Sequence, residues 1–135
     1  MSGKREASQG TANAANTSAA ATAWGPGLYG FSEICLGVYV SAVTGTGVGI
    51  QFFLEGGVSS LNGSRDASTN GVWAVLKDVA GSPCSTAMLD ASHASGYCTL
   101  WQVNVMPEYI RLRYGMQSAG AGSYATFGFG STFKV

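Results

Sequence analysis

Alternation of apolar and polar side chains is the dominant pattern of this chain from about residue 31 onward. Successive side chains of a β-strand point to opposite faces, so a run with this period is typical of a strand that buries one face. Shorter apolar segments at 72–79 and near 87–89 predict two further strands. The apolar positions of the long runs are Ile34, Leu36, Val38, Val40 and Ala42; Val48, Ile50, Phe52 and Leu54; Tyr97, Thr99, Trp101, Val103 and Val105; Ile110, Leu112, Tyr114 and Met116; and Phe127, Phe129, Phe133 and Val135.

Glycine and small residues separate these runs where the chain has to reverse. The turn "TGTG" at 44–47 predicts an antiparallel hairpin between the first two runs, and "QSAGAGS" at 117–123 predicts another between the last two. The segments 56–71 and 80–96 are rich in small and polar residues and predict long loops. No convincing helical period is present. The pattern therefore predicts an all-β fold, a jelly-roll-like antiparallel β-sandwich of about seven or eight strands, with a closed barrel as the alternative.

The first 23 residues have a different composition from the rest of the chain. Residues 7–23 contain no charge, no aromatic side chain and no aliphatic side chain larger than Ala. Such a segment buries too little apolar surface by itself to offset the entropy of ordering it. We therefore expect residues 1–23 to form an extended N-terminal arm, flexible or ordered only by a partner, and residues 24–135 to form the β-sandwich domain.

The low content of charged residues indicates what the surface of the protein contacts. Only 10% of the residues are charged and the formal net charge is zero, whereas about 25% is usual for a soluble domain. A surface this neutral is typical of one covered by neighbouring proteins. It argues against nucleic acid, which needs a basic patch, and Arg111 and Arg113 are the only closely spaced cations of the folded region. No apolar run is long enough for a membrane helix, and "MSGKREASQG" lacks the apolar core of an export signal, so we expect a cytosolic protein that does not bind membranes.

Candidate catalytic and metal-binding residues are few and scattered. His93, the single histidine, lies close in sequence to Asp90 and Ser92, but neighbours in one loop do not converge on one substrate atom as a triad does. The acidic residues have neither calcium-loop spacing nor a paired arrangement. The odd number of cysteines fits neither a disulfide framework nor a metal site. We expect no enzymatic activity, no metal and no cofactor.

Two sets of side chains are candidates for contacts with other molecules. Arg111 and Arg113 alternate with apolar residues and so share the outer face of one strand, where they are either solvated or bind carboxylates of a neighbouring subunit. Aromatic residues such as Trp73 and Trp101 are expected in the core or at a subunit contact, with a sugar-binding face as the alternative.

Three stretches together carry a resemblance to a known family: "ICLGVYVSAVTGTGVGIQFFLEGG" from residue 34, "WAVLKDV" from residue 73 and "PEYIRLRYGMQSAGAGSYATFGFGSTF" from residue 107. They resemble the small jelly-roll capsid cement, or decoration, proteins of tailed bacteriophages across residues 31–135. The Ala-rich segment 7–23 and the loop 84–97 depart from the family pattern.

The resemblance implies a non-enzymatic virion protein that is made in the host bacterial cytoplasm and binds the outer capsid surface between capsomers. Its partners would be the major capsid protein and copies of itself, as a dimer or trimer. The alternatives are a phage tail or baseplate component and a carbohydrate-binding module. The residues we expect at capsid or subunit contacts are Ala14, Asn16, Trp24, Arg65, Asp66, Arg111 and Arg113.

Overall fold

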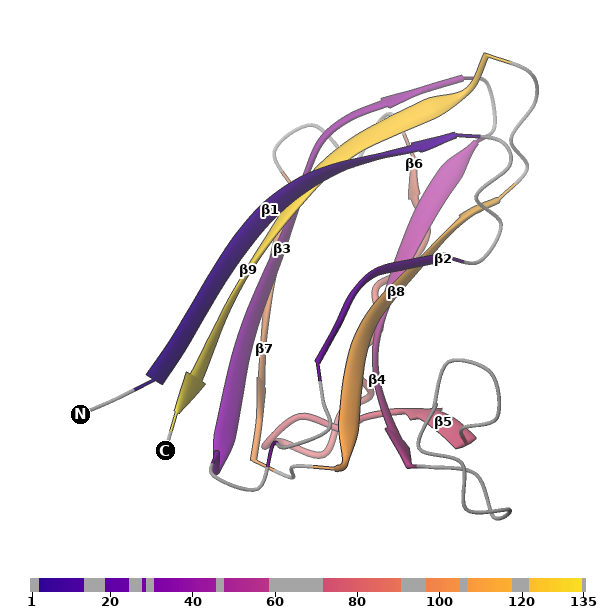
Figure 1. The fold of residues 1–135 in the computed structure, drawn as a ribbon. Helices are drawn as coiled ribbons and strands as arrows, with labels where there is room; N and C mark the ends of the chain where they lie inside the picture. Colours follow the sequence, from indigo (N-terminus) through magenta and orange to yellow (C-terminus); the bar gives the residue numbers. More distant parts are fainter. Residues whose placement is uncertain are drawn as a thin grey trace.

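The computed structural model describes residues 3–13, 19–24, 28, 31–45, 48–58, 72–90, 97–104, 107–117 and 122–134; within 3–13, Gly10 aside, it describes the backbone alone. These residues form two antiparallel sheets that face each other (Figure 1). The strands are β1 (Gly3–Asn13), β2 (Ala19–Trp24), β3 (Glu33–Thr44), β4 (Gly49–Val58), β5 (Val72–Val75), β6 (Leu89–Asp90), β7 (Tyr97–Val103), β8 (Tyr109–Gln117) and β9 (Tyr124–Lys134).

The strand order identifies the sandwich as a jelly roll. The first sheet has the order β1-β9-β3-β7 and the second sheet the order β2-β8-β4-β5, with β6 also paired to β4. Apart from β4 to β5, which stay in the second sheet, the chain changes sheet from each of these eight strands to the next, so that β1, β3, β9 and β7 have their sequence neighbours in the opposite layer. This arrangement of eight strands in two sheets is that of a jelly roll. The predicted fold class is confirmed.

Both predicted hairpins are wrong, because their strands lie in different sheets. β3 pairs with β7 and β9, whereas β4 pairs with β5, β6 and β8. Likewise β8 pairs with β2 and β4, while β9 pairs with β1 and β3. A glycine-rich turn marks a chain reversal, but it does not distinguish a neighbour in the same sheet from one across the core. The intervening turns carry the chain from one layer to the other.

The predicted apolar faces are the ones that form the core. Ile34, Leu36, Phe52 and Leu54 are fully buried between the layers, and the alternating residues of β8 and β9 complete the same cluster. Phe127 packs against Phe52 and Tyr114 with ring centroids 5.1 and 4.9 Å apart. Val105 and Val135 lie outside the described residues.

One residue of the predicted core face in β3 is displaced. The pairing of β3 with β9 shifts register between Val40 and Ala42, so Val43 instead of Ala42 becomes a buried position. A bulge of this kind inserts one residue into a strand and inverts the inward and outward positions that follow it. Strict alternation in the sequence does not reveal it.

The N-terminal segment is part of both sheets, contrary to its expected role as a flexible or partner-ordered arm. β1 pairs along its whole length with β9, from Gly3 opposite Lys134 to Asn13 opposite Tyr124, and β2 pairs with β8. The composition of this segment predicts that its small side chains bury too little apolar surface to offset the conformational entropy lost on ordering it. Backbone hydrogen bonding along two sheets supplies what that argument left out, since each strand adds a ladder of N–H···O bonds to an existing edge.

Candidate interaction surfaces

The outer face of the second sheet carries a compact charged cluster built from β4 and β8. Strand register places Glu55 directly opposite Arg111 and Phe53 opposite Arg113. Arg111 Nε donates to Glu55 Oε1 at 2.7 Å, and Arg113 Nε lies 3.1 Å from Oε2 of the same carboxylate. The Glu55 side chain is only 8% exposed, against 23% and 24% for the two arginines. One buried carboxylate therefore binds two half-buried guanidinium groups.

Aromatic rings fix the planes of both guanidinium groups. Arg111 Cζ lies 4.1 Å from the centroid of the Trp73 ring, and Arg113 Cζ lies 4.2 Å from that of Phe53. Gly57 leaves room for the Trp73 ring, because a Cβ at that position would lie 2.7 Å from ring atoms. These cation–π contacts restrict the arginine rotamers and so strengthen the ion pairs. We call Glu55, Arg111, Arg113, Phe53 and Trp73 the arginine cluster.

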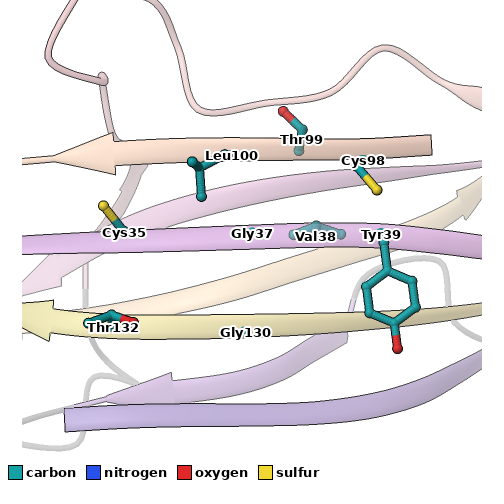
Figure 2. Close-up of a pocket in the computed structure, with 9 residues that line it drawn as sticks. All are labelled: Cys35, Gly37, Val38, Tyr39, Cys98, Thr99, Leu100, Gly130 and Thr132. Atoms are coloured by element: carbon teal, nitrogen blue, oxygen red, sulfur yellow. The ribbon is translucent and has the colours of Figure 1, made fainter. Parts of the chain in front are cut away.

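The outer face of the first sheet has a shallow apolar hollow over β3, β7 and β9 (Figure 2). Its volume is about 320 Å³. Gly37 and Gly130 form its floor, and the side chains around them include Tyr39, Leu100 and Cys98. Leu100 is 70% exposed and Tyr39 is 39% exposed. Adjacent glycines on paired strands create the depression because they place no side chain on the sheet surface.

The three cysteines are free and differ in accessibility. Cys98 is exposed beside the hollow, Cys35 is partly exposed and Cys84 is buried. Burial raises the pKa of the Cys84 thiol from 9.0 to about 11, and the nearby Asp78 carboxylate acts in the same direction. Burial and the Glu33 carboxylate also raise the pKa of Cys35. The described cysteines are thus poor nucleophiles, apart from Cys98, whose thiol is open to reagents.

The arginine cluster contains the only expected contact residues that the structure brings together among those it describes. Arg111 and Arg113 share a partner, Glu55, although the acidic residues are scattered singly in the sequence. Only the strand register reveals that Glu55 lies opposite Arg111. Trp24, also expected at a contact, is 5% exposed and packs edge-on against Phe133 with centroids 5.4 Å apart. Its burial is at odds with a direct role in binding another subunit. The remaining expected contact residues, Ala14, Asn16, Arg65 and Asp66, lie outside the described residues, as does His93.

The tryptophans proposed for a sugar-binding face do not offer flat exposed rings. Trp101 is 5% exposed and belongs to the core. Trp73 is covered on one face by Arg111 and contacts the Tyr109 ring at 6.4 Å between centroids. Sugar recognition by stacking needs an open aromatic face. Neither side chain provides one in this structure.

Neither a membrane-spanning helix nor a cluster of metal-binding side chains is present within the described ranges. None of those residues forms a helix that is long and apolar enough to cross a membrane. They also contain no group of three or more His, Cys, Asp or Glu side chains placed to hold a metal ion.

Comparison with known proteins gives little further guidance. No family model matches the chain, and no curated protein matches it. A solved structure described as "Bacillus endospore appendages form a novel family of disulfide-linked pili" aligns with a TM-score of 0.43 at 14% identity, over 99% of this chain and 88% of that one. This similarity is too low to assign a shared fold or function, and the jelly-roll assignment rests on strand order.

Proposed function

We propose that this chain is a non-enzymatic virion structural protein, a capsid decoration protein that binds the outer surface of a bacteriophage shell between capsomers. The observation that carries the proposal is the apolar hollow with its exposed Leu100 and Tyr39. A contiguous exposed apolar patch is typical of a protein interaction site. The jelly roll is also a fold of viral capsid domains, and the low charge of the chain suits a surface packed among other proteins.

Such a protein would act by mass action and not by turnover. A ligand that binds the assembled lattice and not its free subunits shifts the equilibrium toward the lattice. Many symmetric copies multiply the effect. The partners under this proposal are the major capsid protein and copies of the chain itself. Its location is the capsid exterior, after synthesis in the host bacterial cytoplasm.

The decisive experiment combines purified protein with expanded capsids assembled without it. Electron cryomicroscopy should show ordered density between capsomers, and the melting temperature of the shells should rise. Leu100→Glu should lower occupancy, because it places a charge beside the hollow on a side chain that is already 70% exposed. Val72→Glu, at a residue 58% exposed on the second sheet, is the matched control and should bind as the native chain does.

Bare capsids with an unchanged melting temperature would refute the decoration role. Separating virions into heads and tails would then show whether the protein belongs to the tail, the alternative location. Binding that Leu100→Glu and Val72→Glu leave equally intact would show that the hollow is not the contact surface.

A further inference from the structure

The outer edge of β7 has backbone groups that the described part of the fold leaves open. In an antiparallel pair, the N–H and C=O groups of every second residue point away from the partner strand. Val79 N donates to Gln102 O at 3.0 Å, which marks Gln102 as one of the outward residues, and the same alternation includes Leu100 and Cys98. Among the described residues, none bonds to the outward groups of Leu100 and Cys98.

The side chains of β7 do nothing to block this edge. Its sequence, YCTLWQV, contains no charge and no Pro, and its pairing with β3 has no bulge. Proteins usually protect an exposed edge strand with one of these features, because an open edge is a template for another strand. Here Leu100, in the middle of the strand, is instead 70% exposed and borders the apolar hollow.

We propose that β7 is a dimerisation edge, to which a second copy of this chain adds its own β7 in antiparallel orientation. The two-fold axis passes at Thr99, so that Cys98 lies opposite Leu100 of the second copy. Each copy then contributes two outward residues, and about four N–H···O=C bonds join the sheets. A register centred on Leu100 would instead require the Gln102 carbonyl, which Val79 already occupies.

A second copy is the occupant that best matches this edge. The outward donors and acceptors of a strand match those of its own antiparallel copy, which is the condition for a two-fold contact. Because β7 carries no charge, pairing it with itself brings no like charges together. The exposed Leu100 of one copy would pack beside Cys98 of the other, on the face that holds the hollow.

This inference deepens the proposed self-association, and it is testable without capsids. Analytical ultracentrifugation of the full chain should show a monomer–dimer equilibrium. Leu100→Lys should weaken the dimer at least about tenfold, because it replaces the apolar contact with Cys98 of the second copy by a charge and brings the two lysines to diagonal positions on one face. Val72→Lys, at an aliphatic residue 58% exposed on an edge strand of the second sheet, should leave the dimer unchanged. Circular dichroism melting of both variants verifies that the fold is retained.

Oxidative cross-linking tests the register. Leu100→Cys in a Cys35→Ser background should give a covalent dimer under mild oxidation, because the new thiol faces Cys98 of the second copy at a spacing suited to a disulfide. Adding Cys98→Ser should abolish that dimer.

Three results would overturn the proposal. One is a chain that stays monomeric at about 1 mM; another is a dimer that Leu100→Lys leaves intact. The third is cross-linking that persists after Cys98→Ser, which would exclude the axis at Thr99. If this edge contact fails, capsid binding through the hollow is not affected. Capsid binding by a monomeric chain would refute the dimer and leave the decoration role intact.

Discussion

Replacing Glu55 with Gln tests whether the arginine cluster stabilises the fold. The carboxylate binds two guanidinium groups through separate oxygens, 2.7 Å from Arg111 Nε and 3.1 Å from Arg113 Nε. A Gln side chain keeps one oxygen as an acceptor, but its NH₂ group then faces an N–H donor. One charge-assisted hydrogen bond is lost, worth about 1.5–3 kcal/mol, and the other keeps its cationic donor but loses its anionic acceptor.

The exposure of the three groups sets the expected magnitude. Breaking a fully buried ion pair costs about 3–5 kcal/mol, whereas exposed pairs contribute about 0.2–1 kcal/mol. With the carboxylate 8% exposed and the guanidinium side chains near one quarter exposed, we expect Glu55→Gln to lower the free energy of unfolding by about 2 kcal/mol. In a domain of this size, that corresponds to a fall in Tm of about 8 °C.

Urea denaturation at pH 7, followed by circular dichroism, measures this loss. Glu33→Gln is the control, because Glu33 lies 3.9 Å from a Lys134 side chain that is 52% exposed; it should cost under about 1 kcal/mol. Arg113→Met should cost less in the Glu55→Gln background than in the native chain, since the two groups act together. If Glu55→Gln is no more destabilising than Glu33→Gln, the cluster is an ordinary solvated pair and the reasoning fails.

Four other substitutions test buried or strained positions. Ser131 has a buried hydroxyl for which no partner is found within the described structure, so Ser131→Ala should raise the free energy of unfolding by about 1 kcal/mol in urea titrations; a loss of stability would indicate a missed hydrogen bond. Gly45 has φ of +132° and a Cβ there would lie 2.6 Å from Val48 and Ser123 side-chain atoms, whereas Gly122, with φ of +82°, has open space around it. Gly45→Ala should therefore lower the melting temperature more than Gly122→Ala, for which only backbone strain of about 1–2 kcal/mol applies, and equal shifts would contradict the packing argument. Because the folded-state pKa of Cys84 is raised from 9.0 to about 11, its contribution to stability is complete below pH 9 and is lost as the pH rises toward 11. The drop in unfolding free energy between pH 8 and pH 11 should be about 2 kcal/mol smaller in Cys84→Ala, and an unchanged drop would show that the thiol does not titrate differently in the two states.

The sequence was informative about what each strand buries and uninformative about which strand lies beside it. Alternation identified the inward faces of β4 and β8, such as Phe52 and Leu112, because burial of one face is a local property of a strand. Pairing is a property of the whole topology, so the β3–β4 and β8–β9 hairpins were predicted wrongly. The same limit concealed the Arg111–Glu55 pair, whose members lie on strands far apart in the sequence.

Composition was misleading at the N-terminus for a related physical reason. Counting large apolar side chains estimates what a segment buries by itself, but β1 and β2 are bound through their backbones to β9 and β8. Ala and Thr are sufficient for that, provided that the sheets to which they add are already formed.

The position of β9 between β1 and β3 has a consequence for synthesis on the ribosome. β1 leaves the exit tunnel long before its pairing partner β9 is made, and β3 also waits for β9 along its other edge. The first sheet is not complete until β9 has been translated, so the apolar strands of the nascent chain lack their neighbours until then. Closure of such distant pairs is slow, on the order of milliseconds to seconds, and aggregation competes with it. The yield of soluble protein should thus depend on chaperone capacity and growth temperature more than on the stability of the finished jelly roll.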